Sequence, residues 1–111
     1  MVRRRIPERT LRERILDRDE YRCVYCAEIL PADSLTLDHV QPKLRGGDRS
    51  PGNLVTACRT CNAEKGSAPA WVYLSDRTEQ RENFLRYARG VWPRHRRAIV
   101  EEVVKGSKRT A

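Results

Sequence analysis

The sequence predicts a small α+β domain in which helices flank a middle part held together by a metal ion. The chain has 111 residues, a length that fits one domain. Apolar residues recur at helical spacing toward both ends, and two Cys-x-x-Cys pairs enclose strand-like and loop-like residues between them. We expect one domain over 1–111, with an N-terminal helix (1–20), a clasped core (21–66), C-terminal helices (70–106) and a tail (107–111).

The charge composition favours a polyanionic partner. Lys and Arg number 23 and Asp and Glu number 15, which gives a formal net charge of +8. This excess indicates nucleic acid only weakly, because a basic surface also serves solubility. No apolar run approaches the roughly 18 residues of a membrane span, and no apolar stretch follows the basic N-terminus as in a secretory signal. We therefore expect a cytoplasmic protein without a membrane partner.

The first half of the chain alternates between regular elements and turns. Arg3–Glu20 is predicted to be helical, since its apolar residues recur at helical spacing among Arg and Glu. Leu35–Val40 alternates and is rich in strand formers, which predicts a strand. Lys43–Gly52 is rich in Gly, Ser and Asp and predicts a loop, and Asn53–Thr56 fits a second short strand.

The second half is predicted to be mainly helical. Asn62–Gly66 reads as a short helix that ends at its glycine. A longer helix is expected from about Asp76 to Arg89, and Pro93 opens a last one. Trp71 and Trp92 are expected in the core rather than as platforms for stacked bases.

The four cysteines form the strongest chemical pattern in the sequence. Two thiolates two residues apart can grip one ion from a tight turn, and two such turns complete the tetrahedral set of a structural Zn²⁺ site. The set is Cys23, Cys26, Cys58 and Cys61. A complete set leaves no open position for catalysis. In a reducing compartment we rank two disulfides, a redox pair or an iron–sulfur cluster below zinc.

The stretch between the cysteine pairs carries residues suited to cleaving a phosphodiester. A neutral imidazole such as that of His39 can take a proton from water at physiological pH. A hard divalent cation, held by the carboxylate of Asp38 and the amide of Asn62, can stabilise the phosphate and the leaving oxygen. Neighbours on a regular strand point to opposite faces, so Asp38 and His39 share a cleft only if the strand ends or bulges there.

These residues stand in a pattern that resembles the HNH endonuclease family, in its branch with two bracketing Cys-x-x-Cys pairs and Asn in the last motif position. The resemblance covers about Tyr21–Gly66. It implies a ββα-metal fold and metal-dependent phosphodiester hydrolysis that leaves 3′-hydroxyl and 5′-phosphate ends. The matching segments are Leu37-Asp38-His39-Val40-x-Pro42, Gly46-Gly47, Asn53-Leu54-Val55, Cys58-x-x-Cys61-Asn62 and Lys65-Gly66.

The resemblance also implies a role for each catalytic position. His39 would be the general base that activates water, and Asp38 and Asn62 would bind the catalytic divalent ion. Asn53 would tie the loop down and orient His39. Many family members have His where this chain has Asn62, and oxygen-only ligands favour Mg²⁺ or Mn²⁺ over softer ions.

The remaining basic residues have less specific interpretations. Arg59 and Lys65 are expected beside the site, where they could hold phosphates or equally be solvated. His95 lies in the run Arg94–Arg97 and is expected on the surface, in a solvated helix face that could also follow a DNA backbone.

The sequence thus predicts a metal-dependent DNA endonuclease, with DNA favoured over RNA as the partner. Discrimination between targets would be modest or supplied by a homodimer or another partner. A noncatalytic zinc module that binds DNA or RNA is the alternative, and a redox-sensing protein is a third hypothesis. The enzyme is favoured because a pure binding module requires none of the residues Asp38, His39, Asn53 and Asn62.

Overall fold

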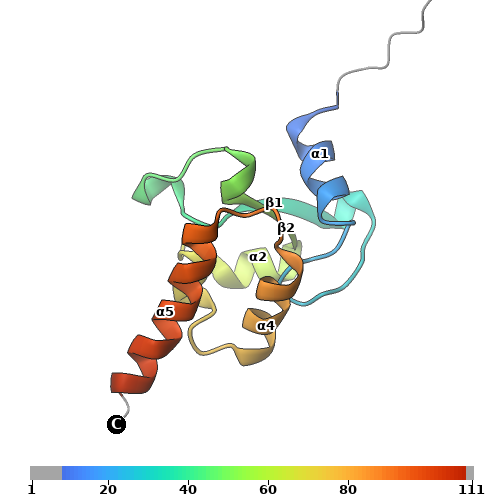
Figure 1. Cartoon of the computed structure of the whole chain (residues 1–111). Helices are drawn as coiled ribbons and strands as arrows, with labels where there is room; N and C mark the ends of the chain where they lie inside the picture. Colours follow the sequence, from blue (N-terminus) through green and yellow to red (C-terminus); the bar gives the residue numbers. More distant parts are fainter. Residues whose placement is uncertain (1–8, 110–111) are drawn as a thin grey trace, which may run out of the picture.

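The computed structural model describes residues 9–109, which fold into helices around one two-stranded sheet (Figure 1). This mixed architecture confirms the predicted α+β class. Residues 1–8, which include the predicted helix start at Arg3, lie outside the described part. In chain order the elements are α1 (Leu11–Arg18), η1 (Ala32–Ser34), β1 (Leu35–His39), η2 (Lys43–Arg45), η3 (Pro51–Asn53), β2 (Leu54–Cys58), α2 (Arg59–Lys65), α3 (Ala70–Tyr73), α4 (Thr78–Tyr87) and α5 (Pro93–Arg109).

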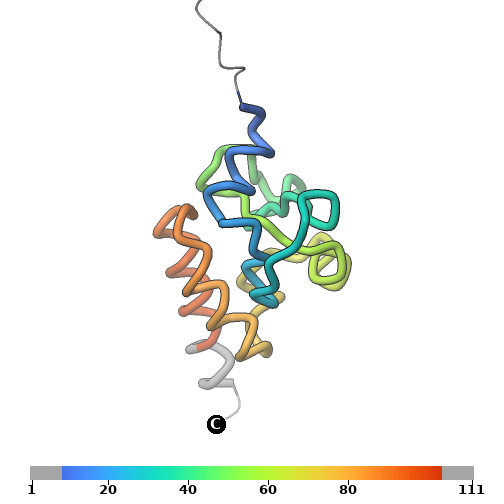
Figure 2. Tube along the Cα trace, turned by 90° about the vertical axis from the view of Figure 1, so that its right-hand side faces the viewer, coloured from blue at the N-terminus to red at the C-terminus, as the bar shows by residue number. Residues whose placement is uncertain are grey.

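The antiparallel hairpin of β1 and β2 is the centre of the fold. Its register runs from Leu35 opposite Cys58 to His39 opposite Leu54. Every residue of β2 is buried, because α1 lies on one side of the hairpin and α2 on the other (Figures 1 and 2). The hairpin therefore places the second cysteine pair at one end and His39 at the other.

Helix α1 is shorter than the predicted Arg3–Glu20. It begins after Thr10, whose side chain accepts a hydrogen bond from the Glu13 amide at 3.1 Å and so caps the first turn. It ends at Arg18, because Glu20 and Tyr21 adopt left-handed backbone conformations with φ of 59° and 56°. The chain then turns into the first cysteine pair.

The structure differs from the prediction in the loop between the strands and at the start of α2. The expected loop Lys43–Gly52 contains the short 3₁₀ turn η2 and most of a second one, η3, which ends at Asn53, where the second strand was predicted to begin. Helix α2 begins at Arg59 and not at Asn62, because the sulfur of Cys58 caps it by accepting from the Cys61 amide at 3.3 Å. Sequence rules for helix starts look for Ser, Thr, Asp or Asn, so a cysteine cap gives no signal.

The C-terminal helices also differ in their limits. The helix predicted from Asp76 to Arg89 is α4, and the separate short α3 precedes it. Helix α5 starts at Pro93 as predicted but continues to Arg109 through most of the expected tail 107–111. One glycine, Gly106, costs a helix only about 1 kcal/mol and does not end this one.

His95 is buried, contrary to the surface position expected for it. Its side chain is 2% exposed and lies between the rings of Trp71 and Trp92, at centroid distances of 6.0 and 5.5 Å. Both tryptophans are half-buried. The run that carries His95 forms the first turns of α5, and these turns pack against α3. Arg94 and Arg97 in the same run are exposed.

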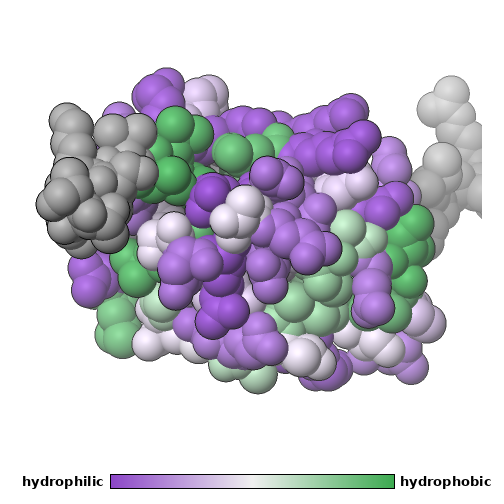
Figure 3. All heavy atoms as spheres, turned by 90° about the horizontal axis from the view of Figure 1, so that it is seen from below, coloured by the Kyte–Doolittle hydropathy of each residue, from purple (hydrophilic) through white to green (hydrophobic). Residues whose placement is uncertain are grey.

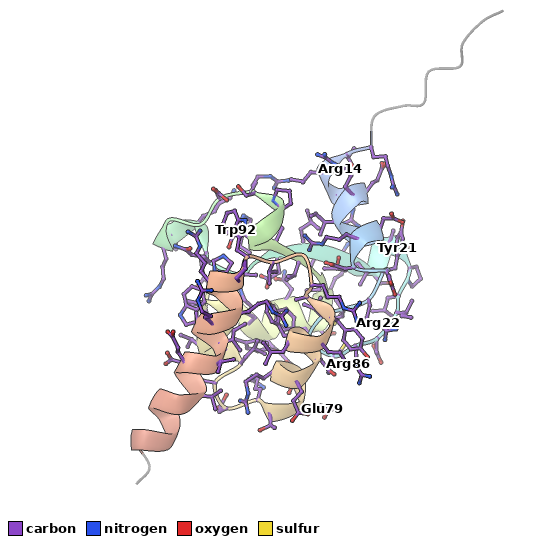
Figure 4. All side chains as sticks on the ribbon, viewed as in Figure 1. Arg14, Tyr21, Arg22, Glu79, Arg86 and Trp92 are labelled. Atoms are coloured by element: carbon purple, nitrogen blue, oxygen red, sulfur yellow. The ribbon has the colours of Figure 1, made fainter. Side chains whose placement is uncertain are left out.

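Trp92 also joins α5 to the loop before β2 (Figure 4). Its amide donates to the Gly52 carbonyl at 3.0 Å. A Cβ atom at Gly52 would lie 2.1 Å from the indole nitrogen, so only glycine allows this approach. Gly52 directly precedes Asn53, and the contact therefore supports the loop beneath the end of β1.

The face seen from below in Figure 3 is mostly hydrophilic, and its apolar residues form separate patches. Among the residues that the structure describes, no helix is both long and apolar enough to cross a membrane.

A buried carboxylate ties α1 to the hairpin. Asp19 is 6% exposed, pairs with Arg18 at 2.9 Å and accepts from the Thr56 amide at 2.9 Å. We expect Asp19→Ala to lower the free energy of unfolding by about 3 kcal/mol, because the buried Thr56 amide and the partly buried Arg18 guanidinium lose their acceptor. A urea titration followed by circular dichroism measures this change.

Asp17→Ala is the matched control two residues earlier in the chain. Asp17 pairs with Arg9 at the surface, where the two side chains are 56% and 51% exposed. We expect its loss to cost less than about 1 kcal/mol. Equal destabilisation by the two substitutions would contradict the role assigned to Asp19.

Candidate functional site

A cleft of about 320 Å³ opens beside the end of β1 and the last turns of α2. Asp38, His39 and Asn62 all line it. Strand β1 ends at His39 without a bulge, so the alternation that would separate neighbouring side chains stops there. The structure therefore brings three of the four predicted motif residues to one opening, and the fourth, Asn53, lies beneath the adjoining loop.

Asp38 is a buried carboxylate with a partner on each oxygen. The Tyr25 hydroxyl donates to Oδ2 at 2.5 Å, and the Lys65 ammonium donates to Oδ1 at 3.0 Å. Burial raises the pKa of Asp38, and the neighbouring Lys65 and Tyr25 oppose that rise. The carboxylate is 5% exposed, yet it lines the cleft.

Tyr25 was not singled out in the sequence. It stands inside the first cysteine pair, fully buried, with its ring edge-to-face on Tyr73 and stacked on Phe84. Burial and the Asp38 charge raise the pKa of Tyr25 well above its usual value, so the hydroxyl stays protonated and acts as a donor. Its position between two cysteines gives no hint of a contact 13 residues further along the chain.

His39 lies at the cleft with one ring nitrogen free. Its Nε2 atom is buried and has no hydrogen-bond partner among the residues that the structure describes. Burial lowers the pKa of His39, and the nearby charges of Lys43 and Arg49 lower it further against the opposing effect of Asp38. The imidazole is therefore neutral at neutral pH and can accept a proton.

Asn53 ties the loop between the strands to the end of β1. Its Oδ1 accepts from the Gln41 amide at 2.8 Å, and its Nδ2 donates to the carbonyls of Gln41 at 3.0 Å and Asp48 at 2.8 Å. The side chain is 1% exposed. Gly47 packs directly on the Gln41 backbone, where a Cβ atom would lie 1.7 Å from the carbonyl oxygen. These contacts fix the loop two residues beyond His39.

Asn62 and Lys65 come from α2. Asn62 lies in the second turn, where its carbonyl accepts from the Gly66 amide at 3.0 Å. Lys65 was expected to be solvated or to hold phosphate, but its side chain is 1% exposed. Its ammonium donates to Asp38 and to the His39 carbonyl, each at 3.0 Å, because burial of a cation requires such partners.

Arg59 does not lie beside the cleft as expected. The hairpin register places it just after Cys58, at the opposite end of the sheet from His39. Its guanidinium donates to the Asp33 carbonyl at 3.0 and 3.2 Å and holds η1 against the start of α2. The structure thus separates Arg59 from the residues with which the sequence grouped it.

The four cysteine sulfurs form a second centre at that end of the hairpin. All lie within 4.8 Å of one another, and the Cys26 and Cys58 sulfurs are 3.9 Å apart. Metal–sulfur bonds of ~2.3 Å in a tetrahedron place the sulfurs ~3.8 Å apart, so the cluster fits one ion. Burial raises the pKa of Cys26 to about 11 and raises that of Cys61 still further. These thiols require a bound cation to ionise at neutral pH.

Comparison with known proteins agrees with this geometry. Residues 23–69 match the family model described as HNH endonuclease. This segment of the chain belongs to the HNH endonuclease family. It begins at the first cysteine and includes the hairpin, the cleft residues and α2.

Two relatives illustrate the likeness. The CRISPR-associated endonuclease Cas9 of Corynebacterium diphtheriae is 29% identical over 59 residues, which are 52% of this chain and 5% of that protein. The crystal structure of the type II-C Cas9 enzyme from Actinomyces naeslundii superposes with a TM-score of 0.63 at 22% identity, over 83% of this chain and 11% of that one. The chain thus spans a small part of each relative, and it shares the fold of the matched part of the Actinomyces enzyme.

The Asn53 contacts generate a test of the loop anchor. We expect Asn53→Ala to lower the hydrogen-exchange protection of the Gln41 amide by about tenfold or more, because this amide loses its buried acceptor. The Val40 amide is the internal control, since it donates to the backbone carbonyl of residue 53 at 2.9 Å and keeps that partner. Unchanged protection at Gln41 would contradict the anchoring role.

Proposed function

We propose that this protein is a DNA endonuclease that hydrolyses phosphodiester bonds with one divalent cation. The observation that carries the proposal is the meeting of a carboxylate, a neutral imidazole and an amide at one open cleft, formed by Asp38, His39 and Asn62. The net charge of +8 suits a polyanionic substrate. DNA is the substrate class that the family resemblance favours over RNA.

His39 acts as the general base. Its imidazole lines the cleft and can take a proton from a water molecule there, and burial keeps the ring neutral and ready to do so. The loop held by Asn53 supports the backbone just beyond His39 and so limits the directions in which the ring can point. The same loop rests on Trp92 through Gly52.

Asp38 and Asn62 would hold the catalytic cation. Their side chains offer oxygen atoms, the ligands that Mg²⁺ and Mn²⁺ prefer. Such a cation would stabilise the developing charge on the phosphate and the leaving oxygen. The Tyr25 hydroxyl keeps the carboxylate of Asp38 in place by its bond to Oδ2.

The cysteine cluster would hold a structural Zn²⁺. Four sulfur donors fill the tetrahedral coordination of zinc, so this ion would take no part in hydrolysis. The zinc would therefore stabilise the fold, and the oxygen-bound cation would take part in hydrolysis.

Plasmid cutting tests the proposal. We expect the purified protein to nick or linearise supercoiled plasmid with Mg²⁺ or Mn²⁺, and His39→Ala to slow this cutting by about 100-fold or more, because the proton acceptor is lost. Gel electrophoresis of the products over time measures both rates. Glu79→Ala, which alters an exposed residue on α4, is the control and should cut like the wild type.

Two results would count against the enzyme. Equal cutting by wild type and His39→Ala would contradict the role of His39. Binding of the plasmid by both proteins in a gel-shift assay, without metal-dependent cutting by either, would instead support the noncatalytic DNA-binding module.

A further inference from the structure

We propose that Lys65 is the counter-ion of Asp38 in the metal-free protein and that a divalent cation must displace it to bind. The inference rests on the proposed function of the cleft and deepens it. It adds a competition between two cations, one supplied by the chain itself and one from solution, for the same carboxylate.

The occupancy of the carboxylate is the first observation. Asp38 has two oxygen atoms, and each already has a buried partner, Tyr25 at 2.5 Å and Lys65 at 3.0 Å. The Lys65 side chain is 1% exposed and that of Asp38 is 5% exposed. Each oxygen keeps a second lone pair, so a divalent cation that takes a carboxylate oxygen would lie beside one of these two partners.

Charge decides which partner leaves. The Tyr25 hydroxyl is neutral and bears no repulsion toward a cation. The Lys65 ammonium is positive, and two cations on one buried carboxylate repel strongly because the surroundings screen them poorly. Exchange of the ammonium for a metal ion leaves the carboxylate with a positive partner, so Asp38 is never left buried without one.

The mobility of the two side chains also favours the displacement of Lys65 over that of Tyr25. The Tyr25 ring is fully buried against Tyr73 and Phe84 and has no room to withdraw. Lys65 has a flexible four-carbon chain and is the last residue of α2. It is the better able of the two to move without disturbing the core.

A place for the displaced ammonium is also present. Lys65 lines the catalytic cleft and, in addition, a neighbouring hollow of about 710 Å³ beside Leu44, Ser67 and Val72. Lys65 is thus a wall residue of both hollows. Its second acceptor, the His39 carbonyl at 3.0 Å, can keep it close while it leaves the carboxylate.

Titration with Mn²⁺, followed by electron paramagnetic resonance of the free ion, tests the competition. At about pH 8, where carboxylates are ionised, we expect Lys65→Met to bind Mn²⁺ about tenfold more tightly than the wild type, because the competing cation is gone. If Lys65 served only to hold Asp38 in place, the same substitution would weaken binding. Unchanged or weaker binding by a folded Lys65→Met protein would overturn the proposal.

Lys43→Met is the matched control. Lys43 is exposed on the wall of the same cleft, and its loss removes the same charge. Asp38 has its two oxygens on Tyr25 and Lys65, so Lys43 is not its partner. We expect an affinity change of less than about threefold, since an exposed charge is screened by solvent and salt. An equal gain in both variants would show a general charge effect and would overturn the competition.

A measurement on the wild type guards against a Lys65 variant that fails to fold. The ¹⁵N signal of the buried Lys65 ammonium should shift during a Mg²⁺ titration, with the same midpoint as metal binding. A signal that stays unchanged while Mg²⁺ binds would overturn the proposal.

Asp38→Asn separates this inference from the proposed function. If the wild type binds Mn²⁺ and Asp38→Asn does not, the result supports Asp38 as a ligand of the cation. The Lys65 measurements alone then test whether Lys65 competes with the cation. If the wild type binds no Mn²⁺, the proposed cation site fails and the competition fails with it.

Discussion

Four sulfur atoms within 4.8 Å of one another join the two chain segments on which the rest of the structure depends. The first segment carries Tyr25 between two of the cysteines, and Tyr25 reaches across to Asp38. The second leads from Cys58, which caps α2, to Asn62 and Lys65 on that helix. Because burial raises the pKa of Cys26 and Cys61, a bound cation is what would keep these two thiols ionised and would hold the four sulfurs together. An ion at this position would therefore set the geometry of the cleft without taking part in its chemistry.

The hairpin connects the cysteine cluster at one end with the cleft at the other. Five paired positions run from the cysteine end to the end at His39, and both faces are covered by helices. At the far end Asn53 and the Trp92–Gly52 contact hold the loop, so the cleft is supported from two directions. A small chain with few aromatic residues can in this way hold a carboxylate, an imidazole and an amide at one opening, which is what a general base and a cation site require.

The sequence was informative wherever a local rule sufficed. Alternation predicted the first strand, cysteine spacing predicted the cluster, and the family resemblance indicated that Asp38, His39 and Asn62 act together. Sequence patterns did not predict the position of a side chain where that position depends on contacts with residues far away along the chain. Lys65 looks like a surface lysine until its pair with Asp38, 27 residues away, is known. His95 sits in an arginine-rich run, yet two tryptophans bury it. Tyr25 and the Cys58 cap leave no recognised signature, because their partners are set by the folded chain.

X-ray absorption spectroscopy on the purified protein, with elemental analysis of the same sample, tests the central claim most directly. The account predicts one zinc ion per chain with four sulfur neighbours at ~2.3 Å. A protein that folds without bound metal, or whose zinc has mainly nitrogen and oxygen neighbours, would contradict it.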